Sequence, residues 1–115
     1  MSRASADRAI ARRRQQAALF AALGDETRLA LIGQLADGEV RSITQLTGGS
    51  NLSRQAITKH LRVLEQAGMV HGVRSGRESR FALDPLPLNE SREYLARVSE
   101  QWDRVLARLK SFVES

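Results

Sequence analysis

Five polar side chains on one face of a predicted helix could bind an acidic polymer. At about 100° per residue, they share an arc of roughly 140° with Glu65 and Gln66. They are Arg54, Gln55, Thr58, Lys59 and Arg62. Their guanidinium, ammonium, amide and hydroxyl groups can donate hydrogen bonds to phosphate oxygens and to base edges. Any amphipathic surface helix carries a polar face, so the neighbouring elements must decide whether this one binds a ligand.

The stretch Leu52–Val70 supplies this helix, which is predicted to cover residues 53–67. Ser53 can cap the N-terminus because its hydroxyl can accept a hydrogen bond from a free backbone N–H. Gly68 can end the helix because glycine adopts the left-handed conformation at low cost. The side opposite the polar arc is apolar and is predicted to be buried: Ala56, Ile57, Leu61, Val63, Leu64 and Ala67.

A basic β-hairpin is predicted directly after this helix, over residues 69–83. A turn is expected at Ser75-Gly76, and three arginines lie near it: Arg74, Arg77 and Arg80. A hairpin that follows such a helix is typical of a wing, whose arginines reach phosphates or a neighbouring minor groove. The alternative is a solvated hairpin whose charges prevent edge-to-edge pairing of strands.

A helix-turn-helix arrangement is predicted from residues 42–67. A short helix spans Ser42–Thr47, with Ser42 as its cap, and four turn-forming residues at 48–51 lead into the polar helix. In this arrangement the second helix lies in the major groove of DNA and the first crosses the backbone. Arg41 and Ser42 are predicted to contact phosphates near the N-terminus of the short helix.

Two further helices are predicted before this unit. One covers residues 8–23, and the apolar residues it offers for burial are Ile10, Ala17, Phe20, Ala21 and Leu23. The other begins at Asp25, its cap, and ends at Gly38; its apolar stripe is Leu29, Ile32 and Leu35, with Leu31 beside them. Three adjacent arginines at 12–14 are expected to be solvated, although they could also contact phosphate.

The last predicted helix, Asn89–Val113, carries an apolar stripe that no later element can cover. A stiff connector over residues 84–87, with two prolines, precedes it. Its apolar residues recur at heptad spacing: Leu95, Val98, Trp102, Val105, Leu109 and Phe112. We expect this stripe, together with Phe20 of the first helix, to form a dimer interface. The alternative is that the helix folds back on its own domain as core.

Composition and charge favour one domain with a polyanionic partner. The chain has 115 residues and a net charge of +5, which suits a single domain. Residues 53–83 hold six basic and two acidic side chains, so the positive charge concentrates on the helix and hairpin. An arginine-rich proteome would explain the total but not the clustering. The basic N-terminus is interpreted as part of the mature protein, because it lacks the apolar region of a secretory signal.

Several classes of function are excluded by what the chain lacks. It has no cysteine, which fits a reducing, cytoplasmic location, and no apolar run approaches the ~20 residues of a membrane span. His60 and His71 alone do not make a metal site, so no metal and no cofactor are expected. The sequence shows neither a nucleophile with a base nor a phosphate-binding loop, so an enzyme is not expected.

Residues 17–84 resemble the ArsR family of bacterial winged-helix repressors. The resemblance rests on FAALGDETRLALIGQLADGE, ITQLTGGSNLSRQAITKHLRVLEQAGMV and RSGRESRFAL. It implies a homodimer, paired through its first and last helices, that binds a palindromic operator, represses transcription and is released by an inducer. Metal-sensing members use cysteines on the short helix, where this chain has Ser42–Leu46, and histidine on the last helix, which has none here. The resemblance is therefore to the branch without the cysteine metal-sensing motif.

The expected fold is mainly α with a small β-hairpin, a winged helix-turn-helix of about five helices and a two-stranded wing. The single domain comprises an N-terminal dimerisation helix (1–24), a DNA-binding core (25–84) and a C-terminal dimerisation helix (85–115). The expected function is sequence-specific repression, with double-stranded DNA, a second copy of the chain and an unidentified inducer as partners, and no membrane. A winged-helix protein-interaction module and a non-specific DNA-binding protein are the alternatives.

Overall fold

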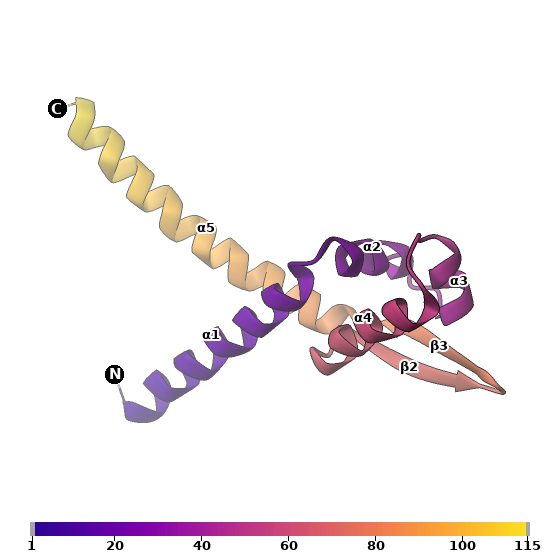
Figure 1. The fold of residues 1–115 in the computed structure, drawn as a ribbon. Coiled ribbons are helices and arrows are strands. Elements are labelled where there is room, and N and C mark those ends of the chain that lie inside the picture. The colour runs from indigo at the N-terminus through magenta and orange to yellow at the C-terminus, as the bar shows by residue number, and fades with distance from the viewer. Residues whose placement is uncertain (1, 115) are drawn as a thin grey trace.

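A winged head and two long diverging helices make up the molecule (Figure 1). The computed structural model describes residues 2–114. Within them lie five helices: α1 (Arg3–Leu23), α2 (Glu26–Leu35), α3 (Ile43–Gly48), α4 (Arg54–Gln66) and α5 (Pro85–Glu114). The strands described are β1 (Arg41–Ser42), β2 (Val70–Ser75) and β3 (Glu78–Leu83). The winged helix-turn-helix predicted from the sequence is confirmed.

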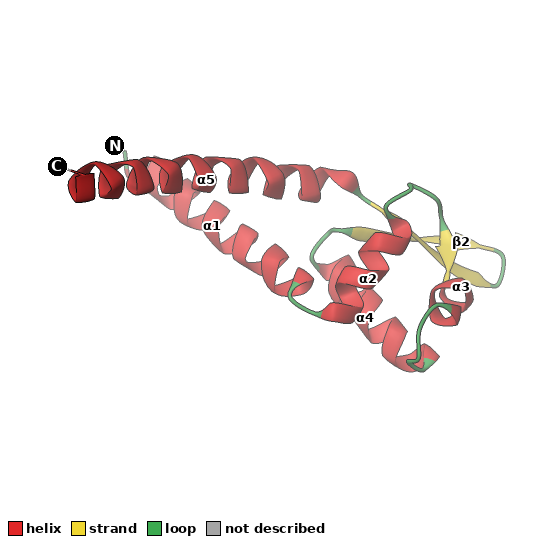
Figure 2. Ribbon diagram, turned by 90° about the horizontal axis from the view of Figure 1, so that it is seen from above, coloured by secondary structure: helices red, strands yellow, loops and turns green. Residues whose placement is uncertain are grey.

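The wing belongs to a three-stranded antiparallel sheet, ordered β1-β3-β2. The prediction of a two-stranded wing missed β1, in which Arg41 pairs with Phe81 and Ser42 with Arg80. The turn also differs, since Ser75 pairs with Glu78 and the two residues between them form it. Seen from above, the sheet lies at the end of the molecule away from the free ends of α1 and α5 (Figure 2).

The head is held together by one apolar core. Its largest fully buried side chains come from α2, α3, α4 and the start of the wing: Leu31, Leu35, Leu46, Ile57, Leu61, Leu64, Met69 and Val70. Two predictions of burial were wrong, because Leu29 and Val63 are exposed. Each lies at the margin of its helix's apolar stripe, where packing against the neighbouring helices decides burial. The core thus fixes α4 with its polar arc facing outward.

Helix α1 is longer than predicted and packs through a different face. It begins at Arg3, with the Ser2 side chain accepting from the backbone N–H of Ser5. Its buried residues are Gln16, Leu19 and Ala22. Of the apolar residues that the sequence offered for burial, Ile10, Ala17 and Ala21 are exposed in the single chain, while Phe20 and Leu23 are partly buried. Residues 6–15 are exposed throughout because this half of α1 extends beyond the head.

Helix α5 starts at Pro85, so the predicted connector is mostly helix. Proline suits the first turn, where its missing N–H would have no partner in the helix. Asp84 assists by accepting a hydrogen bond from the backbone N–H of Leu86 through its side chain, at 3.1 Å. α5 meets α1 near Phe20 and Tyr94, whose ring centroids are 6.3 Å apart. Beyond this contact the two helices diverge (Figure 1).

Candidate nucleic-acid interface

Helix α4 is anchored at both ends by the residues that the sequence predicted. The Ser53 hydroxyl accepts a hydrogen bond from the backbone N–H of Ala56 at 3.1 Å. Gly68 follows the helix with a φ of 80°, the left-handed conformation that a C-terminal glycine supplies. Between these ends, Ile57, Leu61 and Leu64 are fully buried. The buried face fixes the rotation of the helix about its axis.

The opposite face of α4 presents hydrogen-bond donors to solvent. Arg54, Gln55, Lys59 and Arg62 are exposed, and the intermediate Thr58 donates its hydroxyl hydrogen to the Arg54 carbonyl at 2.7 Å. With Ser53 and Ala56, these residues line an open hollow of about 640 Å³. All five side chains of the predicted polar arc therefore lie on one accessible surface.

Helix α3 is attached to α4 through a residue that the sequence did not single out. Arg54 Nη1 donates to Thr44 Oγ1 at 3.0 Å, which joins the first turns of the two helices. Ser42 is buried, and its hydroxyl and backbone N–H are both engaged by Gln45 in a capping box. Ser42 thus shapes the start of α3 and does not present its hydroxyl at the surface. Arg41 is partly buried and pairs with Asp37 at 2.6 Å.

Two arginines of the wing form no ion pair within residues 2–114. Arg74 and Arg77 are exposed on either side of the turn, and neither is paired with a carboxylate within the described chain. Arg80 instead pairs with Glu78 on the same strand at 3.2 Å. The tip is therefore more strongly basic than the middle of β3. In Figure 1 the wing projects from the head on the side away from the ends of α1 and α5.

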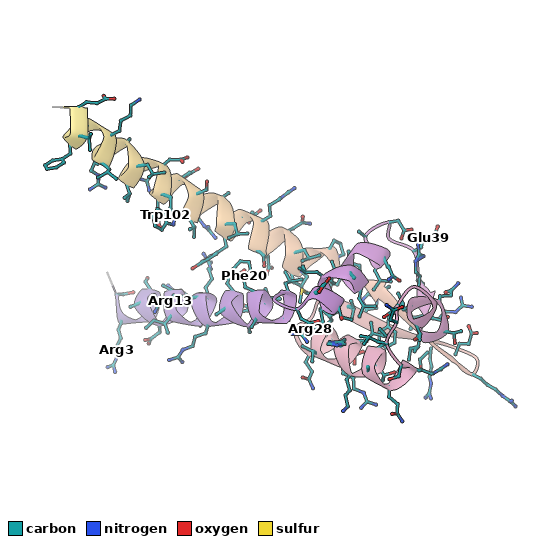
Figure 3. All side chains as sticks on the ribbon, turned by 45° about the horizontal axis from the view of Figure 1, so that its top comes forward. Arg3, Arg13, Phe20, Arg28, Glu39 and Trp102 are labelled. Carbon is teal, nitrogen blue, oxygen red and sulfur yellow. The ribbon has the colours of Figure 1, made fainter. Side chains whose placement is uncertain are left out.

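His60 joins α4 to the start of α2. Its Nδ1 lies 3.2 Å from Nη1 of Arg28 and 3.7 Å from a carboxylate oxygen of Asp25. Figure 3 shows Arg28 where α1, α2 and α4 come together. The backbone N–H of Arg28 donates to the Asp25 carboxylate and lowers the pKa of that group, and the charge of Arg28 lowers it further. Across residues 2–114, no cluster of three or more His, Cys, Asp or Glu side chains could hold a metal ion.

Comparison with known proteins identifies the family of the chain. Residues 23–73 match a model described as a helix-turn-helix domain. The HTH-type transcriptional regulator YuzN of Bacillus subtilis is 39% identical over 77 residues, which cover 62% of this chain and 84% of that protein. The solved structure of an ArsR-like transcriptional regulator from Rhodococcus sp. RHA1 is 39% identical, with a TM-score of 0.73, and the match covers 86% of this chain and 92% of that chain. The chain belongs to the ArsR family of transcriptional regulators.

Membership of the ArsR family makes the chain a DNA-binding transcriptional regulator. A further relative, the HTH-type transcriptional repressor SmtB of Mycobacterium tuberculosis, is 34% identical over 65 residues, which cover 56% of this chain and 47% of that protein. The family model includes α2, α3, α4 and the start of β2. The elements that position the polar arc are thus the ones shared with the family. Among residues 2–114, no helix is both long and apolar enough to cross a membrane.

Proposed function

We propose that the protein is a dimeric, sequence-specific repressor that inserts α4 into the major groove of a palindromic operator. The observation that carries this proposal is the exposed donor face of α4, fixed in orientation by a fully buried opposite face. A helix of this shape fits the major groove, where base edges present distinct patterns of donors and acceptors.

The side chains of the polar arc suit the chemistry of base pairs and phosphates. A glutamine amide such as that of Gln55 pairs with adenine, and an arginine such as Arg62 pairs with guanine. Arg54, Thr58, Lys59 and Ser53 can bind phosphates or further base edges. On the wing, Arg74, Arg77 and Arg80 would bind the phosphates flanking the half-site, or its minor groove. Arg41 would add a phosphate contact beside α3.

Dimerisation through α5 and α1 would place two copies of α4 in successive major grooves, about 34 Å apart. The apolar stripe of α5 supports this proposal because all its members except the partly buried Val98 are solvent-exposed in the single chain; Trp102, for example, is 61% exposed. Trp102 follows the buried Ser91 by eleven residues, so both fall on nearly the same face of the helix. That face looks toward α1, on which Phe20 lies (Figure 3). The alternative, in which α5 folds back as core, is not supported by these exposures.

Repression would be steric, because an occupied operator blocks access to promoter sequence. The repressor relative SmtB supports this direction of regulation. Release would require an inducer that binds the DNA-incompetent dimer more tightly than the DNA-bound form. In this proposal residues 25–84 read DNA, the flanking helices set the dimer, and the protein acts in the cytoplasm without a cofactor.

Selection of bound sequences from random double-stranded DNA tests the proposal. We expect enrichment of an inverted repeat whose half-sites lie about one helical turn apart. Binding that falls with salt but enriches no sequence would instead indicate a non-specific DNA-binding protein. No binding to any duplex would favour a protein-interaction module.

A further inference from the structure

An acidic side chain lies on the otherwise donor-rich face of α4. Glu65 falls within the same arc as Arg54 and Arg62 at about 100° per residue. A carboxylate on a surface that meets phosphates would weaken binding by charge repulsion. The structure gives Glu65 a different partner, because its Oε2 accepts a hydrogen bond from the backbone N–H of Gly72 at 3.2 Å.

Gly72 lies on the outer strand of the sheet, where a backbone N–H can be left without a strand partner. β2 is at the edge in the order β1-β3-β2. A Cβ at position 72 would lie 3.3 Å from Glu65 Oε2 and 3.9 Å from Phe81 Cε1. The first of these distances is tighter than an ordinary van der Waals contact. The missing side chain therefore lets the carboxylate approach the strand. The backbone conformation does not itself require glycine here, because φ at Gly72 is not positive.

Two backbone hydrogen bonds hold the base of the hairpin next to the end of α4. Met69 donates its N–H to the Leu64 carbonyl at 3.0 Å and accepts from the N–H of Asp84 at 2.9 Å. Within residues 2–114, the Glu65–Gly72 bond is the one that joins α4 to the wing beyond this base. It borders a hollow of about 260 Å³ that Arg74, Arg80 and Phe81 also line. On this side of the sheet the hydrogen bond holds β2 against α4 beside the hollow, while the pairing of β1 with β3 holds the other edge of the sheet.

We propose that Glu65 is a positioning residue for DNA binding: its bond to Gly72 sets the angle between α4 and the wing. The angle decides whether Arg74 and Arg77 reach the phosphates beside the half-site that α4 occupies. This inference rests on the proposed function of α4 and the wing. Glu65 thus acts on DNA through the arginines of the wing and not through its own charge.

The sign of a mutational effect separates positioning from simple charge. Removing a carboxylate that only repels DNA would strengthen binding. Glu65→Gln removes the charge but keeps an acceptor oxygen for Gly72, whereas Glu65→Ala removes both. We expect Glu65→Ala to bind the selected operator roughly five- to tenfold more weakly than Glu65→Gln, as the loss of one backbone hydrogen bond allows. The slope of log affinity against log salt should also fall by about 1 to 2, because wing phosphate contacts are lost.

A control variant that also removes one acidic side chain, and a combination of Glu65→Ala with changes in the wing, complete the test. Glu39→Ala removes an exposed acid outside α4 and the wing, and it should leave the salt slope unchanged. In a background with Arg74→Ala and Arg77→Ala, Glu65→Ala should cost no further affinity, because the wing no longer contacts phosphate. Amide exchange at Gly72 in the DNA-free protein should be faster for Glu65→Ala than for Glu65→Gln, with equal melting temperatures showing that both fold.

Three outcomes would overturn the inference, and they are distinguishable. If the parent protein bound the operator while Glu65→Ala and Glu65→Gln bound it equally, the positioning role would be wrong and the proposed function would stand. If the parent protein bound no DNA, both would be wrong. Equal exchange at Gly72 in the two variants would also count against the positioning role, whatever the affinities.

Discussion

Nη1 of Arg28 lies 3.2 Å from Nδ1 of His60, in a hydrogen bond that joins α2 to α4. Because a guanidinium can only donate, the imidazole nitrogen is the acceptor. The Nε of the same arginine donates to the carbonyl of Ala22 near the end of α1. The Arg28 side chain therefore ties α2 to both α1 and α4.

Arg28→Ala should lower the free energy of unfolding by roughly 1–2 kcal/mol, because it leaves the partly buried His60 and the Ala22 carbonyl without this donor. His60→Ala should cost less, and the double variant should cost less than the sum of the two. Urea unfolding followed by circular dichroism measures all three. The exposed Arg92 of α5 provides the control, since Arg92→Ala should change stability by less than about 0.5 kcal/mol. Strict additivity of the two changes would contradict the pairing.

The Asp25 carboxylate should make stability depend on acid pH. Its pKa is below the ordinary value of 3.8, chiefly because it accepts the backbone N–H of Arg28. A group with a lowered pKa in the folded state stabilises above its unfolded pKa, and that contribution is lost as pH falls through the folded pKa. Asp25→Asn keeps a capping oxygen but does not titrate. Between about pH 5 and pH 2 the parent should therefore lose more stability than the variant. Parallel curves of unfolding free energy against pH would show that Asp25 contributes nothing to this dependence.

The polar arc should carry the affinity for the operator. Gln55→Ala and Arg62→Ala should each weaken binding by roughly 1–3 kcal/mol, because each removes hydrogen bonds to the duplex without touching the buried face. Fluorescence anisotropy with the selected operator and with a scrambled duplex distinguishes base contacts from phosphate contacts. A base contact loses discrimination between the two duplexes, whereas a phosphate contact weakens both alike. Arg104→Ala on α5 is the control, and unchanged operator binding by both arc variants would remove α4 from the recognition role.

The exposed stripe of α5 should hold the dimer together. Trp102→Asp places a charge at the middle of the stripe, where burial would remove it from water, so the variant should be monomeric at concentrations where the parent is a dimer. Sedimentation velocity measures the change. Arg104→Asp introduces the same side chain on the opposite side of α5 and should remain dimeric. A Trp102→Asp dimer of parental stability would rule out this interface.

The elements that depend on neighbours in the chain could be predicted from the sequence. The cap at Ser53, the left-handed Gly68 and the polar arc between them are set within a few residues, and all are present. Which face of α1 is buried could not be predicted in this way. Gln16 is inward because its side chain accepts a hydrogen bond from the Ser91 hydroxyl at 2.8 Å, from a residue 75 positions later.

Short or unusual elements escaped prediction for other physical reasons. β1 has two residues, too few to display an alternating pattern, and it exists because β3 offers it a partner. The start of α5 was missed because proline was interpreted as a helix breaker, although the first turn tolerates it. In the same way Thr44 gave no signal of its own, since its role depends on the reach of the Arg54 side chain.

The buried Gln16–Ser91 hydrogen bond, at 2.8 Å, lies where the two long helices α1 and α5 meet. α5 has 30 residues and is therefore about 45 Å long at the rise of an α-helix. The 23 residues of α5 beyond Ser91 span about 35 Å, so a rotation of roughly 5° at this hydrogen bond would displace the end of the helix by roughly 3 Å. In a dimer assembled along α5, a small change of angle at this one polar pair would thus be magnified into a change in the distance between two DNA-binding heads. Because the helical pitch of DNA fixes the spacing of the half-sites, one angle between α1 and α5 would let both heads bind and another would not.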